Sequence, residues 1–262
     1  DAYLRALLPA LGWLFSPLMT LAGLLLIGSG ISLVAMHGDQ FLDSSHLVLS
    51  PYNWLSMLLA WVGLKILHEL GHGVVCKRYG GEVREAGVVL ILCAPAAYVD
   101  VTSCWRLPSK WTRIHVALAG MYVELLVAAA AAVLWTQTDS LVMRNQLFSI
   151  IFMASISTIV FNANPLMRFD GYYVLADLLE IPNLATEGHR FVRQLAAGFF
   201  LGQTGSGCGL TGFRSWLVRV YGLCAMMWRA IVCASLFAAA SVLLHGLGIV
   251  LGMLGLVAWL GR

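Results

Sequence analysis

The stretch WLSMLLAWVGLKILHELGHGVVC, from Trp54 to Cys76, decides the fold of this chain. Its 23 residues are mostly apolar, and a helix of about 20 apolar residues spans the ~30 Å hydrocarbon core of a bilayer. The stretch therefore predicts a transmembrane helix. Ionisable side chains are costly at membrane depth and usually serve a function there. The histidines and the glutamate of this stretch are thus the first candidates for chemistry.

Residues 68–72 of this stretch are His-Glu-Leu-Gly-His, the H-E-x-x-H pattern. Positions i and i+4 of a helix lie on one face about a turn apart, so the imidazoles of His68 and His72 can reach one Zn²⁺. Glu69 can then act as general base on a zinc-activated water. The pattern predicts zinc-assisted hydrolysis. The alternative is a bundle core in which these polar groups only satisfy one another, without a metal.

The composition is that of an integral membrane protein. Hydrophobic residues make up 60% of the chain and charged residues 11%, whereas soluble domains have about 45–50% apolar and about 25% charged residues. The net charge is only +3, and Lys and Arg lie near the ends of apolar runs. The expected partner is therefore the lipid bilayer, and no nucleic-acid partner is expected. The six cysteines form no C-x-x-C pair and are predicted to be reduced thiols.

Six apolar runs are predicted to cross the membrane: Trp13 to Val34, Trp54 to Cys76, Ile114 to Trp135, Leu147 to Phe161, Val218 to Leu244 and Leu247 to Leu260. The fourth is short, but the polar Asn162, Asn164 and Pro165 that follow it can remain at membrane depth if they line a protein-enclosed cavity. The last has only 14 residues. The predicted fold class is an all-α polytopic membrane protein with about six transmembrane helices.

Residues 80–106, between the second and third spans, differ in character from the helices. They carry Gly-Gly, Pro95 and the β-prone clusters Val88 to Leu92 and Tyr98 to Thr102, which predict a short β-hairpin or re-entrant segment. Further along, Thr186 to Phe200 is an amphipathic candidate for lying on the membrane surface, and the glycine-rich Gln203 to Ser215 is a predicted loop.

A third metal ligand must come from elsewhere, because catalytic zinc usually takes three protein ligands and leaves one position open. Asp170 is the candidate. It lies in Asn162-Ala-Asn-Pro-Leu-Met-Arg-Phe-Asp-Gly171, just after the fourth span. The five-residue step from Pro165 to Asp170 predicts a broken helix that can aim a carboxylate inward, and Gly171 permits a tight backbone there.

These two segments resemble the site-2 protease family of intramembrane zinc metalloproteases, which pairs H-E-x-G-H in one core helix with N-x-x-P-x-x-x-L-D-G in a later one. Phe169 stands in the usual Leu place. The resemblance extends from about Leu55 to Leu184. Tyr98-Val-Asp-Val-Thr and the segment 164–173 resemble the bacterial branch of peptide zinc metalloproteases, whose members are often joined to a membrane-fusion-protein-like domain.

The resemblance implies that His68, His72 and Asp170 are zinc ligands and that Glu69 is the catalytic base. It also implies a substrate that is a membrane-spanning or membrane-associated peptide, partly unwound for cleavage. Gly87 to Thr102 resembles the family's hairpin and edge strand, which can pair with such a chain by β-augmentation. A membrane-fusion-protein-like domain or a transporter subunit is a candidate partner.

The chain departs from the family in its third span. Family members commonly carry Gly-Pro-x-x-Asn there, whereas this chain has Gly-Met-Tyr-Val-Glu, ending at Glu124. Three roles are open for Glu124: an auxiliary acid, an alternative ligand, or a buried partner of Lys65 or His115. The last is favoured, because charges within the membrane usually pair. Lys65 either snorkels or is ion-paired, or it polarises a substrate carbonyl. Asn162 is the third candidate auxiliary residue.

Three parts are expected along the chain: residues 1–53 with the first transmembrane helix and an external loop, residues 54–184 with the metalloprotease core, and residues 185–262 with the amphipathic segment, the glycine-rich loop and the C-terminal transmembrane helices. The chain starts at Asp1 rather than Met, so it is expected to be a piece of a longer polypeptide.

The predicted function is an intramembrane zinc metalloendopeptidase that takes part in peptide processing or export. One alternative is a non-proteolytic membrane scaffold or export-accessory subunit, but a structural zinc site needs no general base such as Glu69. Another is a Ste24-like zinc protease, which takes a glutamate as third ligand; the Asp170-Gly171 context disfavours it.

The orientation in the membrane follows from the basic residues. Eleven Lys and Arg lie within residues 77–113 and 168–219, but only Arg144 lies within 36–53 and 136–146. The positive-inside rule then assigns the first two connections to the cytoplasm. We therefore expect a bacterial inner-membrane protein whose metal-site motif lies near the cytoplasmic side.

Single cysteines introduced into a variant without the native cysteines test this orientation. Ser44→Cys and Asp139→Cys should react with a membrane-impermeant maleimide applied to intact cells, because both lie in exterior connections. Ser109→Cys and Glu187→Cys should react only after permeabilisation. The reverse labelling pattern would overturn the orientation.

Overall fold

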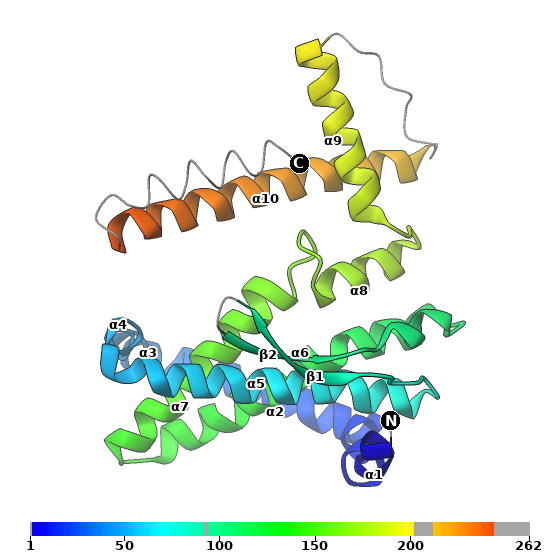
Figure 1. The fold of residues 1–262 in the computed structure, drawn as a ribbon. Coiled ribbons are helices and arrows are strands. Elements are labelled where there is room, and N and C mark those ends of the chain that lie inside the picture. Colours follow the sequence, from blue (N-terminus) through cyan, green and yellow to red (C-terminus); the bar gives the residue numbers. More distant parts are fainter. Residues whose placement is uncertain (1, 92–93, 202–211, 244–262) are drawn as a thin grey trace. The chain divides into compact units, whose positions relative to one another are not determined.

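The computed structural model describes residues 2–91, 94–201 and 212–243. It divides into two compact units, residues 1–180 and 181–262 (Figure 1). The predicted sixth span, Leu247 to Leu260, most of the glycine-rich loop, Cys93 and Cys208 lie outside the described residues. Within the described part Cys76, Cys104, Cys224 and Cys233 form no disulfide, and their reduced state stays a prediction.

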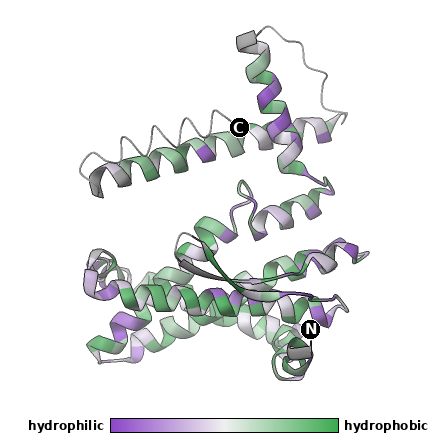
Figure 2. Ribbon diagram, in the orientation of Figure 1, coloured by the Kyte–Doolittle hydropathy of each residue, from purple (hydrophilic) through white to green (hydrophobic). Residues whose placement is uncertain are grey.

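Five helices in the described part are long and apolar enough to cross a membrane. They are α2 (Pro17–Met36), α5 (Pro51–Arg78), α6 (Lys110–Gln137), α7 (Leu141–Ser155) with its continuation η3 (Ile156–Asn162), and α10 (Phe213–Leu243). Hydrophobic residues dominate these helices along most of their length, as Figure 2 shows. The predicted all-α polytopic membrane fold is confirmed, with five of the six expected spans.

The fourth span is longer than its apolar run suggested. Helical structure begins at Leu141 and continues to Asn162, which gives 22 residues. The polar start of this helix is accommodated because Arg144 lies 4.9 Å from the ring centroid of Trp135 and donates to Gln40 Oε1 at 2.6 Å. The prediction of a short fourth span was therefore wrong.

Short helices occupy the segments around the first two spans. They are α1 (Ala2–Leu11), η1 (Gly12–Phe15), α3 (Gly38–Asp43) and α4 (His46–Leu49). Ser16 caps α2 by accepting from the Met19 N–H at 3.4 Å, and Pro17 follows it. This is the usual start of a helix, since Pro lacks the N–H that would be unpaired there.

The predicted hairpin lies between α5 and α6. Strands β1 (Ala86–Ile91) and β2 (Ala94–Val99) pair antiparallel, with Ala86 opposite Val99. This confirms the β-structure expected from the sequence. Val88 and Leu90 of β1 are 65% and 74% exposed, so the hairpin leaves apolar side chains without cover in the first unit.

Helix α6 is central to the first unit, because it packs against α2, α5, α7 and α8 (Asp170–Leu179). Small residues permit close approach of the helices, as is common in membrane proteins. A Cβ atom at Gly30 of α2 would lie 2.8 Å from the Cα of Ala129 in α6. A Cβ atom at Gly71 of α5 would lie 3.0 Å from the carbonyl oxygen of Ala119.

In the second unit, α9 (Leu184–Leu201) packs against α10. The two helices meet at glycines: a Cβ atom at Gly222 would lie 2.5 Å from the Gly188 carbonyl oxygen. The amphipathic segment expected from Thr186 to Phe200 lies within α9. Its position on the membrane surface stays a prediction.

Gly30→Ala should destabilise the first unit by about 1–3 kcal/mol, because the added methyl group overpacks the contact with Ala129. Gly28→Ala is the matched control, since Gly28 lies on the same helix and a Cβ atom there meets nothing within 4 Å. Thermal unfolding of both variants in the same detergent measures the difference. Equal midpoints would contradict the close α2–α6 contact.

Candidate metal centre

Helix α5 directs His68 and His72 towards α6, and both side chains are buried. Gly120 of α6 lies opposite them. A Cβ atom at Gly120 would lie 2.6 Å from the Nε2 atoms of both histidines. The absence of a side chain at this position therefore leaves room for the two imidazoles.

Asp170 reaches the same place through a broken helix. After η3, a π-helix, the chain turns and resumes as α8 at Asp170. Asn164 supports the turn by accepting from the Leu166 N–H at 2.9 Å. A Cβ atom at Gly171 would lie 2.5 Å from the Ala163 carbonyl oxygen, so only glycine fits there. The broken helix expected between Pro165 and Asp170 is confirmed.

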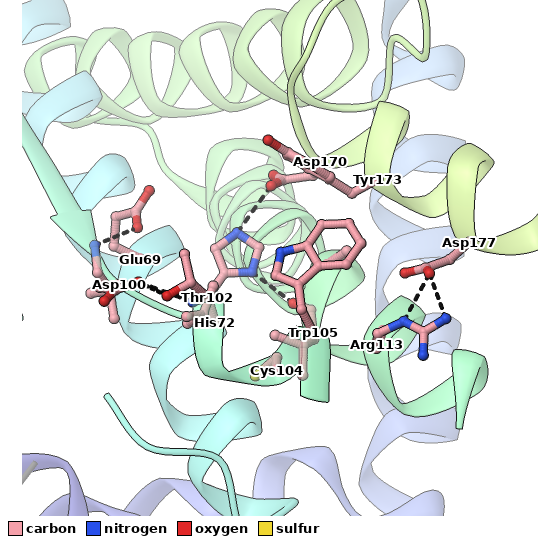
Figure 3. A pocket seen from close by; sticks show the side chains of 14 residues that line it. Glu69, His72, Asp100, Thr102, Cys104, Trp105, Arg113, Asp170, Tyr173 and Asp177 are labelled. Carbon is pink, nitrogen blue, oxygen red and sulfur yellow. Dashed lines mark hydrogen bonds and ion pairs between the residues drawn. The ribbon is translucent and has the colours of Figure 1, made fainter. Parts of the chain in front are cut away.

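The three predicted ligand residues converge. His68 Nε2 lies 3.0 Å from Asp170 Oδ2, His72 Nε2 lies 3.4 Å from Asp170 Oδ1, and the two Nε2 atoms are 2.9 Å apart. Zinc bonds of ~2.0–2.2 Å at tetrahedral angles separate ligand atoms by ~3.3–3.6 Å. The observed triangle is close to that size, so these residues could hold a metal ion. Figure 3 shows the Asp170 carboxylate directed at the His72 ring.

The second nitrogen of each imidazole has its own acceptor. His72 Nδ1 donates to the Val116 carbonyl oxygen at 2.7 Å, and His68 Nδ1 lies 3.2 Å from Glu124 Oε1. A carbonyl oxygen can only accept, so Nδ1 of His72 carries the proton and its Nε2 is left for a metal. Such outer hydrogen bonds fix the tautomer and the orientation of metal-binding histidines.

The state of Asp170 also suits a metal ligand. Burial opposes ionisation of this carboxyl group, but the hydrogen bonds with His68 and His72 outweigh it and hold the pKa of Asp170 well below its ordinary value. A carboxylate must be deprotonated to bind a metal. Asp170 meets that condition at neutral pH.

Glu69 lies beside the ligand group and is tied to the hairpin. Its Oε2 accepts from the Val99 N–H at the end of β2, at 3.0 Å. Figure 3 shows this bond from the α5 side chain to the strand. Glu69, His72 and Asp170 all line one cavity of about 270 Å³. The predicted general base and two of the three candidate ligands therefore share the same cavity.

The remainder of the cavity wall mixes aromatic and ionised groups. Trp105 and Tyr173 meet edge to face, with ring centroids 5.6 Å apart. Arg113 binds Asp177 Oδ1 through Nε at 2.8 Å and Nη2 at 2.7 Å. Hydrogen bonds from the Thr102 hydroxyl and backbone N–H lower the pKa of Asp100. Asp100, Thr102 and Tyr173 lie in the segments that carry the family resemblance. Trp105, Arg113 and Asp177 were not singled out as site residues, because they come from three separate segments.

The auxiliary candidates form a cluster next to His68. Glu124 is 0% exposed and accepts from Lys65 Nζ at 3.0 Å. Of the two expected partners Lys65 is thus the one found, and His115 instead bonds the Tyr79 hydroxyl at 2.9 Å. Asn162 Nδ2 donates to Glu124 Oε2 at 3.2 Å. The hydroxyls of Ser157 and Thr158 also donate to this carboxylate, a role that sequence reasoning missed.

Comparison with known proteins points to one family. Residues 56–145 match the model of Peptidase family M50. The match confirms the resemblance to the site-2 protease family. It includes the motif from His68 to His72 and ends before Asp170.

Two curated proteins are similar over parts of the chain. "Putative peptide zinc metalloprotease protein YydH" of Bacillus subtilis is 27% identical over 129 residues, 49% of this chain and 49% of that protein. "Uncharacterized protein MJ0971" of Methanocaldococcus jannaschii is 29% identical over 75 residues, 28% of this chain and 20% of that protein. The similarity thus spans about half the length of the first relative. No solved structure matches significantly.

Asp170→Ala should reduce zinc affinity, because it removes one of three protein bonds to the metal. The loss should exceed the roughly 10–100-fold that is typical when a hydrogen-bond partner of a metal ligand is removed. Asp100→Ala is the control, since Asp100 is an acidic residue of the same cavity outside the ligand triangle. Metal analysis of the purified proteins gives the result. Wild-type zinc content in Asp170→Ala would show that the third ligand is another residue.

Proposed function

We propose that this protein is an intramembrane zinc metalloprotease that hydrolyses a peptide bond in or near a transmembrane segment of a membrane-associated polypeptide. The observation that carries the proposal is the convergence of His68, His72 and Asp170 beside the carboxylate of Glu69. The match to Peptidase family M50 supports it. So does the set of five helices able to cross a membrane.

The proposed chemistry divides between the metal and one side chain. Bound Zn²⁺ supplies Lewis acidity, which polarises a carbonyl group and makes water more acidic. Glu69 takes a proton from the attacking water and delivers it to the leaving amine. The hydrogen bond from Val99 holds the Glu69 carboxylate at the cavity, so the base is oriented before substrate binds.

The hairpin is proposed to present the substrate. A peptide bond in a helix is hydrogen-bonded within its own segment, so the substrate must unwind before cleavage. An extended chain then needs other partners for its backbone, and strand addition supplies them. The apolar exposed side chains of Val88 and Leu90 suit a chain that arrives from the membrane. The hairpin is itself anchored beside the base, because the Val99 N–H of β2 donates to Glu69.

A bacterial inner membrane, with the metal centre towards the cytoplasm, is the proposed location. The eleven Lys and Arg residues of the two cytoplasmic connections support it. Processing of an exported peptide, with a membrane-fusion-protein-like domain or a transporter subunit as partner, is the proposed setting. The relative named as a peptide zinc metalloprotease agrees with a peptide substrate.

Glu69→Gln separates an enzyme from a scaffold. The variant should keep its zinc, because Glu69 is outside the ligand triangle, and should lose cleavage by about 10²–10⁴-fold, because Gln cannot take a proton. Glu82→Gln is the isosteric control, since Glu82 is exposed and lies outside the cavity lining. The measurement is mass spectrometry of membrane peptides that accumulate in cells with each variant, together with zinc analysis. Peptide processing at the wild-type level in Glu69→Gln would favour the non-proteolytic scaffold.

A further inference from the structure

Glu124 is a fully buried carboxylate that the proposed chemistry leaves without a role. It lies on α6 within the bundle, and its exposed fraction is 0%. A buried charge is retained only when its partners compensate the loss of hydration. Its contacts therefore indicate what the residue does.

Five side chains surround the two oxygens of Glu124. Oε1 lies 3.0 Å from Lys65 Nζ, 3.2 Å from His68 Nδ1 and 3.1 Å from the Ser157 hydroxyl. Oε2 accepts from the Thr158 hydroxyl at 2.6 Å and from Asn162 Nδ2 at 3.2 Å. All five can donate, and a carboxylate offers about four lone-pair sites. The acceptor capacity of Glu124 is filled, and Lys65 balances its charge.

These partners come from α5, which carries His68, and from η3, which precedes the turn that leads to Asp170. Lys65 and His68 lie one turn apart on α5. Ser157, Thr158 and Asn162 belong to η3, the π-helix that leads into the turn before Asp170. π-Helical turns are rare and occur frequently at functional sites. One carboxylate on α6 thus joins the helix of the first ligand to the segment before the third.

The two histidines differ in how they are held. The acceptor for His72 Nδ1 is a backbone carbonyl, that of Val116. The acceptor for His68 Nδ1 is a side chain, that of Glu124. The orientation of His68 can therefore be altered by a single substitution, whereas that of His72 is fixed by the helix backbone.

We propose that Glu124 is a positioning residue of the metal centre, which orients His68 through Nδ1 and fixes the η3 segment that precedes Asp170. This inference rests on the metal site of the proposed function. It does not require the protein to cleave peptides. Loss of an outer partner of a metal-bound histidine typically lowers metal affinity by about 10–100-fold.

The test uses the double variant Lys65→Met with Glu124→Met, which removes both buried charges together, takes away the acceptor for His68 Nδ1 and leaves no unpaired ion. Zinc affinity is measured on the purified full chain by competition with a chromophoric chelator. Thermal unfolding of the metal-free protein is measured in parallel. The expected result is a roughly 10–100-fold weaker zinc affinity, with an altered visible spectrum of the Co²⁺-substituted protein, because the His68 ring is no longer fixed.

Ser149→Ala is the matched control. Ser149 is also fully buried, and its hydroxyl bonds Asn53 of α5 and the Asn145 carbonyl rather than a histidine. It should lower the unfolding temperature of the metal-free protein and leave zinc affinity unchanged. If Glu124 had only a structural role, the double variant would likewise show a lower unfolding temperature and an unchanged zinc affinity.

Glu124→Asp provides a second variant that keeps the charge balanced by Lys65 and shortens the side chain by one methylene. It too should bind zinc more weakly, because the shorter side chain cannot reach His68 and Thr158 together. Wild-type affinity in either folded variant would overturn the positioning role while the metal site stands. A wild-type protein that binds no zinc would overturn the metal site and this inference together.

Discussion

The contact of the Asp170 carboxylate with both histidine Nε2 atoms is the interaction on which the rest of the structure depends. It brings together residues about a hundred positions apart in sequence, so α5, α6 and the η3–α8 connection must all be in place before it forms. Inside a bundle of apolar helices such polar groups cannot rely on water. Nδ1 of each imidazole has its own acceptor, and both Nε2 atoms lie within 3.4 Å of the Asp170 carboxylate, so the polar groups find their partners within the protein.

Glycine creates the space for this contact. Gly120 gives room to the imidazoles, Gly71 lets α5 approach α6, and Gly171 lets α8 begin against the preceding turn. Each of these positions would place a Cβ atom 3.0 Å or less from a neighbouring atom. The polar centre therefore depends on glycines that leave space around it as well as on the side chains within it.

Much of this was predictable from the sequence, for physical reasons. Length and hydropathy predict the spans, because the bilayer sets the helix length. The spacing of His68 and His72 predicts one shared face, and the Pro165-to-Gly171 step predicts the broken helix. Other features depend on long-range contacts. The polar start of α7 is helical because Arg144 contacts Trp135 and Gln40. The π-helical turn that directs Ser157 and Thr158 towards Glu124 has no recognisable pattern in the sequence.

The most direct test of the metal centre is X-ray absorption spectroscopy at the zinc edge of the purified protein. The structure predicts two imidazole nitrogens and carboxylate oxygen at ~2.0–2.2 Å. Cys76 lies four residues after His72, and Cys104 lines the cavity, so thiolates are available nearby as competing ligands. A sulfur shell at about 2.3 Å, or a spectrum with a single imidazole, would contradict a centre made by His68, His72 and Asp170.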